Sequence, residues 1–475
     1  MTSDPLGAAR AALAGEPAWL VGGAIRDRLL GREPRRPDLD IIVDGDPEAS
    51  ARRLARAASA AVFGLSDAFG GWRVVGPRQA WQVDLTPLQG GSLQADLGAR
   101  DLTVNAIAEP LAGGALIDPH GGRDDLRARR LRMVAAEAFA ADPLRTLRVV
   151  RLACLLGFEV EPATITAARR HAGAVAGVAG ERVFAELRAI VTADAVLDGL
   201  ALMDELGLTV VVLPELHALR GVGQNAYHHR DVHGHTLEVL EAVIALERDP
   251  AAWLGDELAA PVIALLSEPL ADELTRAGGL RLGALLHDAA KPQTRVELAG
   301  GRVGFPHHDS AGVEVARAAL TRLRASERLR EHVAALARHH LRLGFLVHEA
   351  PLDRRAVYRY LMACEPVAAD VTLLSIADRR ATRGRKADEA IASHLTLARA
   401  LLTDALSWRD GPPAEPLVRG DELARALDIE PGPRLGALLA AIAEARYAGE
   451  VATQAQAITL ARRLTAAQAS SSSAP

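Results

Sequence analysis

Hydrophobic and polar residues alternate in short runs over the first part of the chain and then change to a helical period. Up to about residue 134, β-like runs separate helical segments, and these runs read AWLV, LDIIV, GWRVVG, AWQVDL and ALID. After residue 135, apolar residues recur at helical spacing almost throughout. The pattern predicts one small α/β head followed by long all-α domains.

Turn-forming residues mark the expected boundaries between these domains. Pro214 and the glycine turn at residues 221–223 precede a histidine-rich part, and GPPAEP near Pro412 precedes the last part. We therefore expect a head over residues 1–134, a helical neck over 135–215, a histidine-rich helical domain over 216–400 and a helical C-terminal region over 401–475. The tail AQASSSSAP is expected to be disordered.

Composition places the chain among globular proteins. Its 475 residues are 49% hydrophobic, which is ample for real cores. No signal segment is visible at the N-terminus, and no apolar run reaches the ~18 residues of a membrane helix, so a cytoplasmic enzyme is expected. Cys154 and Cys364 lie in apolar helical surroundings and predict free core thiols, without a disulfide framework or a thiolate metal site.

The net charge of -5 hides local differences in charge and residue type. Between His120 and Ile190 there are twelve Arg against eight Asp or Glu, enough to hold a phosphate backbone. Twelve of the fifteen histidines lie between His217 and His348, which indicates a second metal site. Lysine occurs at only two positions, so a lysine inside a motif stands out.

Residues 18–43 combine a glycine turn with two carboxylates. An apolar strand ends in Gly22-Gly23 and a helical segment follows, so free helix amides would face a phosphate on the turn. Asp38 and Asp40 open the next β run and share one face of it. This combination favours magnesium-dependent phosphoryl or nucleotidyl transfer over the alternative interpretation, a plain turn and a solvated DxD.

Two further segments extend this site. Asp84, on the opposite face of its run from Val83, is placed to pair beside the DxD strand and complete a two-metal cluster; a strand-edge Asp is the alternative interpretation. In RDLTVNA, Arg100 and Asn105 flank an apolar pair. Contacts to triphosphate and ribose are the functional interpretation of that segment, and an ordinary helix start is the alternative.

Six motifs follow one another as LVGGAIRDRLLG, DLD, ARDLTVNA, DPHGGRDDL, ADPLRTLR and GERVFAEL. Over roughly the first 215 residues the chain thereby resembles class II CCA-adding tRNA nucleotidyltransferases, relatives of bacterial poly(A) polymerase. The resemblance implies a polymerase-β-like head with a mixed sheet, Mg2+ as cofactor, and tRNA, CTP and ATP as partners. It also implies addition of C, C and A to tRNA 3′ ends without a nucleic-acid template.

The same resemblance implies roles for single residues. Asp38, Asp40 and Asp84 would be the catalytic carboxylates, with Asp38 and Asp40 binding Mg2+. Arg182 and Arg188, in and directly after GERVFAEL, would contact RNA. The nucleotide-binding residues would be Gly22, Gly23, Arg26, Arg100, Asp101, Asn105, Asp142, Arg145, Arg148 and Arg151.

Asp142 and Arg145 have the chemistry that base selection needs. A carboxylate accepts from an exocyclic amino group while a guanidinium donates to the neighbouring ring nitrogen, a polarity that C and A match and U and G do not. The alternative interpretation makes Asp142 an N-cap and Pro143 the first residue of a helix. The family usually has Glu before this Asp; here Ala141 removes that supporting contact.

From His217 onward the chain resembles an HD-domain phosphohydrolase fused behind the transferase. His235, the pair His287-Asp288 and Asp378 match the ligand set of that family, which suits a divalent metal whose bound water is the nucleophile. Taken singly, each His fits a surface or capped helix position better than a metal site, but as a set, with Lys291 three residues after Asp288, they favour a metal site. A possible second ion would be bound by His308, His339 and His340, and a substrate phosphate by Lys291.

Full CCA addition with an appended HD domain is the function that we expect. The alternatives are CC-only addition, a poly(A) polymerase, an HD domain that is the main enzyme, and an HD half that only grips tRNA; the oligomeric state stays open. The fifteen residues between Asp84 and Arg100 bear on the first alternative. They are fewer than in the flexible loop of A-adding relatives, and Gly90-Gly91 predict a floppy segment.

Overall fold

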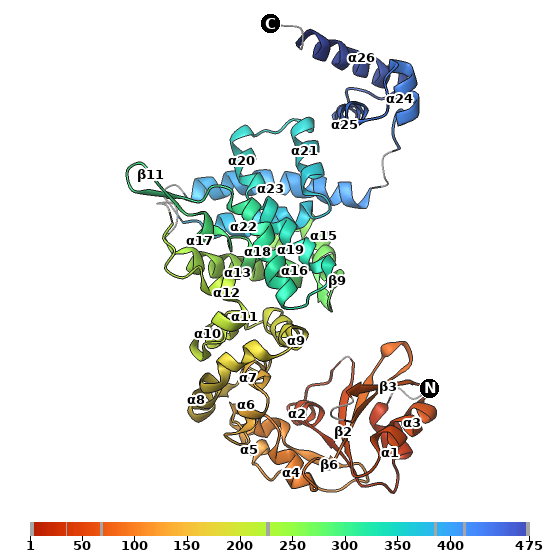
Figure 1. Ribbon diagram of the computed structural model, residues 1–475, viewed down its shortest axis with the longest axis vertical. Coiled ribbons are helices and arrows are strands. Elements are labelled where there is room, and N and C mark those ends of the chain that lie inside the picture. The colour runs from red at the N-terminus through yellow and green to blue at the C-terminus, as the bar shows by residue number, and fades with distance from the viewer. Residues whose placement is uncertain are drawn as a thin grey trace. The chain divides into compact units, whose positions relative to one another are not determined.

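The computed structural model describes residues 4–34, 36–66, 70–224, 229–383, 387–411 and 415–471. The chain forms two compact units, Met1–Leu213 and Pro214–Pro475, coloured red to yellow and green to blue in Figure 1. The division falls at Pro214, where turn residues predicted a boundary.

A mixed six-stranded sheet forms the head of the first unit. Its strands are β1 (Ala18–Val21), β2 (Asp38–Val43), β3 (Ala61–Ser66), β4 (Gly71–Val75), β5 (Gln82–Pro87) and β6 (Ala108–Pro110). They lie in the order β3-β4-β5-β2-β1-β6, in which β2 and β5 run parallel and the other neighbours antiparallel. The predicted α/β head with a mixed sheet is confirmed.

The two faces of this sheet are covered differently. Helix α3 (Pro47–Ala58) packs on β4 and β5 and buries Leu54, while its N-cap Asp46 accepts from two helix amides. On the face that carries Ile42, an apolar cluster includes Val21 and Leu97. Because side chains alternate along a strand, Asp38 and Asp40 lie on that same face. They remain exposed where the apolar cover ends.

The connection between β5 and Arg100 is folded, contrary to the floppy segment that its glycines predicted. Ser92 caps α4 (Leu93–Gly98) by accepting from Ala95 N at 3.2 Å. Asp96 accepts from Gln89 N at 3.1 Å, and Leu97 is fully buried. These contacts fix the segment against the sheet.

The neck continues the first unit with helices and one short strand pair. Helix α7 packs against both α9 and α10. Cys154, in α7, is a buried free thiol, as its apolar surroundings predicted. The helices are α5 (Gly122–Arg127), α6 (Ala138–Ala141), α7 (Leu144–Leu156), α8 (Pro162–His171), α9 (Gly180–Val191), α10 (Val196–Leu206) and α11 (Thr209–Val212), and β7 (Arg130–Leu131) pairs with β8 (Glu159–Val160).

The second unit is built around packed helices. Helix α13 contacts α16 and α22, α16 contacts α19, and α18 lies along α19. The main helices are α13 (Val232–Arg248), α15 (Asp256–Ser267), α16 (Arg276–Leu286), α17 (Lys291–Thr294), α18 (His308–Arg322), α19 (Glu327–His339), α20 (Arg342–Leu346), α21 (Arg354–Cys364), α22 (Ala368–Ala381) and α23 (Ala387–Asp410). Two short antiparallel pairs were not predicted: β9 (Pro269–Ala271) with β10 (Leu274–Thr275), and β11 (Val296–Leu298) with β12 (Arg302–Gly304).

Three C-terminal helices share a small core of their own, which includes Leu423, Leu438 and Ala457. They are α24 (Gly420–Leu427), α25 (Pro433–Tyr447) and α26 (Gln454–Ser471). The expected disorder of the tail is wrong up to Ser471, since α26 extends to that residue; residues 472–475 lie outside the described part. In the described part of the chain no one helix has the length and apolar character of a membrane span, although α21 and α22, bent by 98°, meet that test as a pair.

Candidate functional site

The glycine turn brings a carboxylate and a guanidinium together. Gly22 has φ +75°, a conformation that favours glycine, and it precedes α2 (Gly23–Leu29). A Cβ atom on Gly22 would lie 3.1 Å from Asp40 Oδ2 and 3.3 Å from Arg100 Nη1. The lack of a side chain therefore lets the turn, Asp40 and Arg100 approach one another.

The strand register gathers the carboxylates. Asp40 lies directly opposite Asp84 in the parallel β2–β5 pair, as the sequence pattern predicted, and Asp38 lies opposite Gln82. Gln82 Nε2 donates to Asp38 Oδ1 at 2.8 Å. Arg73, opposite Asp84 on β4, donates to both Asp84 oxygens at 2.7 Å. Asp84 is therefore held rigidly by an arginine that the sequence did not identify.

The electrostatics of this cluster fit a divalent cation. Although the Asp40 residue is accessible at the sheet edge, protein surrounds its carboxylate, and this loss of hydration raises the pKa of Asp40 to about 6. Arg100 opposes the rise in pKa, whereas Asp38 and Asp84 add to it. Clustered carboxylates that repel one another are ligands that Mg2+ prefers, so Asp38 and Asp40 fit that ion, whereas both oxygens of Asp84 are already held by Arg73.

A chain of polar contacts leads from the turn to the neck. Arg26 Nη1 donates to Asn105 Oδ1 at 2.8 Å, and Asn105 Nδ2 donates to Asp101 Oδ1 at 3.1 Å. Arg148, on α7, donates to Asp101 Oδ2 at 3.1 Å. Asp101 is 4% exposed, and although burial alone would raise its pKa, Arg148 and Asn105 hold that pKa below the ordinary value. Four of the predicted nucleotide-binding residues, Arg26, Asn105, Asp101 and Arg148, thus form one connected network.

Two of the neck arginines are engaged by Glu186. Arg151 Nε donates to Glu186 Oε2 at 2.6 Å, and Arg148 Nε lies 3.5 Å from Glu186 Oε1. Burial lowers the pKa of Arg148, but Asp101 and Glu186 more than compensate and raise it. Both guanidinium groups therefore join α7 to α9, and Arg148 also joins α7 to the head.

Asp142 is paired with an arginine of α9 and not with Arg145. Its Oδ2 accepts from Arg182 Nη2 at 2.8 Å and its Oδ1 accepts from Leu144 N at 3.2 Å, so it also caps the start of α7. Arg145 instead donates through Nη1 to Ala138 O at 3.3 Å, and burial lowers its pKa. Asp142 and Arg145 are near each other without a direct hydrogen bond, and Arg188 lies half-buried further along α9.

In the second unit, histidines and aspartates form two adjacent groups of potential metal ligands. The first consists of His235, His287 and Asp378, and the second of Asp288, His308 and His340, with the ligand atoms of each group within 4.8 Å of one another. His235 Nε2 lies 2.9 Å from Asp378 Oδ1. His287 Nε2 lies 3.2 Å from Asp288 Oδ2, which links the two groups.

The imidazole rings of these groups are oriented by backbone carbonyls. His287, His308 and His340 each place Nδ1 within 2.8 Å of the carbonyl oxygen three residues earlier. That contact assigns the proton to Nδ1 and leaves Nε2 as an acceptor. All three Nε2 atoms are buried without a hydrogen-bond partner, so the donor set fits a divalent metal.

Two predicted residues near these groups have other partners. Lys291 Nζ contacts Asp288 Oδ2 at 2.6 Å and Gln224 Oε1 at 2.8 Å. His339 lies outside both groups, and its Nδ1 accepts from Arg342 Nε at 3.1 Å. Adjacent helical residues point about 100° apart, so His339 and His340 do not reach the same side.

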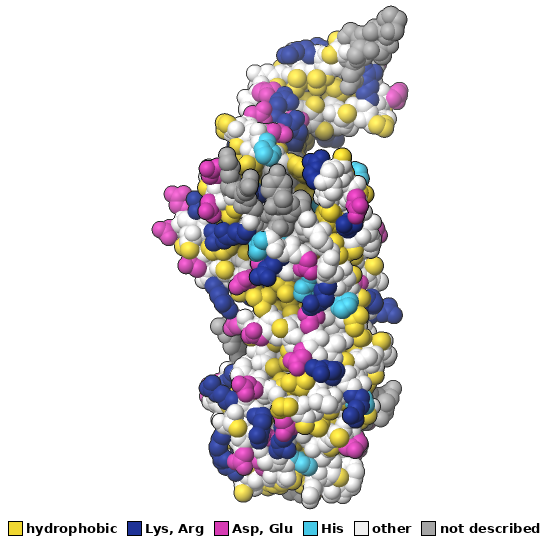
Figure 2. All heavy atoms as spheres, turned by 90° about the vertical axis from the view of Figure 1, so that its left-hand side faces the viewer, with side chains coloured by type: hydrophobic (Ala, Val, Ile, Leu, Met, Phe, Trp, Pro, Cys, Tyr) yellow, Lys and Arg dark blue, Asp and Glu magenta, His cyan; other side chains and the backbone are white. Residues whose placement is uncertain are grey.

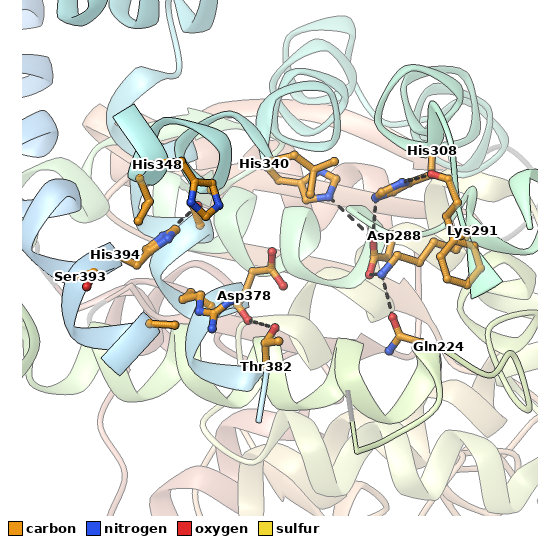
Figure 3. A pocket seen from close by; sticks show the side chains of 18 of the residues that line it. Gln224, Asp288, Lys291, His308, His340, His348, Asp378, Thr382, Ser393 and His394 are labelled. Atoms are coloured by element: carbon orange, nitrogen blue, oxygen red, sulfur yellow. Dashed lines mark hydrogen bonds and ion pairs between the residues drawn. The ribbon is translucent and has the colours of Figure 1, made fainter. Parts of the chain in front are cut away.

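A cavity of about 750 Å³ lies beside these groups, and Figure 3 shows the members of the second group, Asp288, His308 and His340, at one side of it. Asp288, His308, His340 and Lys291 converge there, while His348, Ser393 and His394 lie across the cavity. Ser375 Oγ contacts His394 Nε2 at 3.2 Å. The sequence did not identify this second wall, because its histidines carry no recognisable spacing relative to the first.

One face of the first unit shows basic and acidic side chains together. In Figure 2, Lys and Arg side chains gather over the lower part of the molecule, with Asp and Glu among them. The neck arginines described above pair with acidic residues in the same manner. The surface that was predicted to bind a phosphate backbone therefore carries both basic and acidic side chains.

Models of known protein families match successive parts of this chain. Residues 18–86 and 73–132 match the family model of the poly(A) polymerase head domain. Residues 157–220 match the model described as a probable RNA and SrmB-binding site of polymerase A, and residues 232–383 match the HD domain.

Similar proteins cover nearly the full length. The A-adding tRNA nucleotidyltransferase of Deinococcus radiodurans is 36% identical over 452 residues, which is 94% of this chain and 95% of that protein. The CC-adding tRNA nucleotidyltransferase of Thermus thermophilus is 36% identical over 449 residues, or 93% and 92%. A solved CCA-adding enzyme in complex with ATP has the same fold, with a TM-score of 0.61 at 19% identity over 96% of this chain and 95% of that one.

Proposed function

Since this chain belongs to the tRNA nucleotidyltransferases that carry a poly(A) polymerase head and an HD domain, we propose that it adds C and A, from CTP and ATP, to tRNA 3′ ends without a template. The observation that carries this proposal is the register of β2 and β5. It puts Asp84 beside Asp40, next to the Gly22 turn.

In the proposed reaction the head residues bind and orient the triphosphate. Asp38 and Asp40 would hold Mg2+, which would neutralise charge on the phosphates and favour ionisation of the attacking 3′-hydroxyl. Arg100 lies at the turn, where its Nη2 contacts Asp96 Oδ1 at 3.5 Å, while its Nε is buried without a hydrogen-bond partner in the described part of the chain and would donate to a phosphate oxygen. Arg73 keeps Asp84 in one orientation.

In the neck, Asp142 and Arg145 would select the base. Asp142 would accept from the amino group of C or A and Arg145 would donate to the adjacent ring nitrogen, while U and G present the opposite polarity. Arg182, which donates to Asp142 Oδ2, would keep this carboxylate pointed in one direction. We further propose that Arg182 and Arg188 contribute to the surface that holds tRNA.

CC-only addition is the second candidate, and one observation favours it. The connection between β5 and Arg100 is short and held by the Ser92 cap and by buried Leu97, so it supplies no long flexible loop to reshape the pocket for A. Sequence identity does not distinguish full CCA addition from CC-only addition, because an A-adding and a CC-adding relative are both 36% identical to this chain.

In the test, the purified protein is incubated with tRNAs that end before CCA, after C and after CC, each together with one labelled nucleotide. The proposal expects two C and one A to be added in order, and no U or G. A tRNA that ends in CC, given ATP alone, is decisive: one added A excludes CC-only addition, and no extension excludes full CCA addition. A long A tract would instead identify a poly(A) polymerase.

For the second unit we propose a metal-dependent phosphohydrolase. The support is chemical, since three oriented imidazoles with unpartnered Nε2 atoms stand beside two aspartates at a cavity. A non-catalytic arm that only grips tRNA would not need these ligands. Metal analysis of the purified protein, before and after dialysis against a chelator, distinguishes the two.

A further inference from the structure

The cavity beside the HD-type ligands has two cationic side chains among its described lining residues, Lys291 and Arg379. An anionic substrate needs at least one cation that is not already neutralised. The surroundings of these two cations differ, and the difference identifies which one is available.

Lys291 is already neutralised by protein groups. Its Nζ contacts Asp288 Oδ2 at 2.6 Å and donates to Gln224 Oε1 at 2.8 Å. It also lies 5.4 Å from the centre of the Phe305 ring. Because Asp288 belongs to the second ligand group, Lys291 serves to orient that carboxylate.

Arg379 has no such partner. Its side chain forms no hydrogen bond or ion pair within the described part of the chain, and its Nε is shielded from water. It directly follows Asp378 in α22, and thus stands beside the first ligand group. A guanidinium that is partly desolvated and lacks an acceptor is costly, and a bound anion would remove that cost.

Among the other described lining residues, His394 does not supply a permanent positive charge. Burial lowers the pKa of His394 to about 4, with Arg379 contributing to the effect, so this imidazole is neutral at pH 7. An arginine keeps its charge at every relevant pH, and its planar fork can donate to two oxygens of one phosphate.

We propose that Arg379 binds the non-bridging oxygens of the phosphate ester that the HD-type site acts on, and that Lys291 positions Asp288. This inference rests on the proposed phosphohydrolase function of the second unit. It names the chemical class of the ligand, a phosphate or phosphate ester, and a binding residue that motif matching did not identify.

The chain offers a matched control in the next residue. Arg380 is exposed, lies 4.4 Å from the centre of the Trp253 ring and does not line the cavity. Metal-loaded protein is titrated calorimetrically with inorganic phosphate. Arg379→Gln should bind phosphate at least tenfold more weakly than wild type does, which is about the contribution of one charged hydrogen bond. Arg379→Lys should fall between Arg379→Gln and wild type, and Arg380→Gln should equal wild type.

Metal content and melting temperature are measured on the same samples. The inference would be supported if Arg379→Gln keeps its full metal content and melting temperature but binds phosphate more weakly, while Arg380→Gln binds phosphate like wild type. Equal phosphate binding by metal-loaded Arg379→Gln and wild type would overturn it and leave the phosphohydrolase proposal standing. A wild-type protein that binds no metal in its second unit would overturn both.

Discussion

At the scale of single residues, Asp40 lies where the glycine turn, two other carboxylates and Arg100 meet. We expect Asp40→Asn to reduce nucleotide addition by about a hundredfold or more, because loss of a metal ligand removes several kcal/mol of transition-state stabilisation. Asp44→Asn, just beyond the other end of β2, is the matched control and should add nucleotides normally. The measurement is incorporation of labelled C into tRNA that lacks CCA; near-normal addition by Asp40→Asn would refute the site.

Asp142 combines capping with proposed base selection, and two variants separate these roles. Asp142→Ala should cost about 1 kcal/mol of stability through the lost cap and should admit UTP and GTP. Arg182→Gln removes the partner that orients Asp142 Oδ2 but leaves the carboxylate, so it should relax the exclusion of UTP and GTP less than Asp142→Ala does. Misincorporation assays with each nucleotide decide this. If Asp142→Ala excludes UTP and GTP as well as wild type does, Asp142 is only a cap.

At this scale, a side-chain contact can be predicted from the sequence only where a local pattern specifies the partner residue. The pairing of Asp84 with Asp40 followed from strand alternation, but Arg73 was missed because its pairing with Asp84 requires the order of β4 and β5 in the sheet. For the adjacent histidines a local signal existed. The buried residues Leu329, Val333 and Leu336 continue at helical spacing to His340 and not to His339.

At the scale of elements, the turn between β1 and α2 supports a paired test. Gly22→Ala and Gly31→Ala both place a side chain at positive φ, +75° and +68°, so each should lose stability, and Gly22→Ala should lose more because its ψ of −137° lies outside the left-handed helical region. Only Gly22→Ala also brings a Cβ to 3.1 Å from Asp40 Oδ2; around Gly31 there is nothing within 4 Å. We therefore expect nucleotide addition to fall strongly for Gly22→Ala alone, as measured by initial rates. Equal loss in both variants would mean that strain, not crowding, is responsible.

The contact between α7 and the head gives a pH-dependent prediction. Because Arg148 and Asn105 hold the pKa of Asp101 below its ordinary value, Asp101 stabilises the fold above about pH 4, and this stabilisation is lost as pH falls through the lower folded-state pKa. Asp101→Asn should cost about 1–3 kcal/mol at pH 7, since it removes one charged partner of half-buried Arg148, which keeps its contact with Glu186.

Urea unfolding of both proteins over a range of pH checks this. The stability difference between wild type and Asp101→Asn should be constant near neutrality and shrink below about pH 4. Asp124→Asn, which breaks an exposed pair with Arg127, should change stability little at any pH. A difference that grows on acidification would contradict the assigned pKa shift.

Elements with one buried face were predictable from sequence, and others were not. Alternation located β1, β2, β4 and β5, each of which buries apolar residues against the head core. The edge strand β3 is largely exposed and so lacks that alternation, while the run ALID contributes only a bridge from Ile117 to Ala108. Pairing across an edge is decided by the neighbouring strand, and no local pattern reports it.

At the scale of the whole molecule, the chain divides into two compact units at Pro214, one of the turn residues noted in the sequence. The two candidate sites fall in different units: the carboxylates of the head precede Leu213, and the HD-type ligands come after Pro214. Each unit closes its own core, so chemistry at one site does not require residues from the other.

This separation predicts that the two activities can be removed independently. The double variant His287→Ala with Asp288→Ala takes one ligand from each group and should lose metal and phosphohydrolase activity in the second unit. It should keep nucleotide addition within the range of wild type, because Asp38 and Asp40 are untouched. Asp40→Asn is the reciprocal variant and should retain the second unit's metal. Metal content and both activities are measured on each protein, and a melting profile confirms that each is folded. If the folded double variant loses nucleotide addition in proportion to phosphohydrolase activity, the two sites are coupled and their independence is refuted.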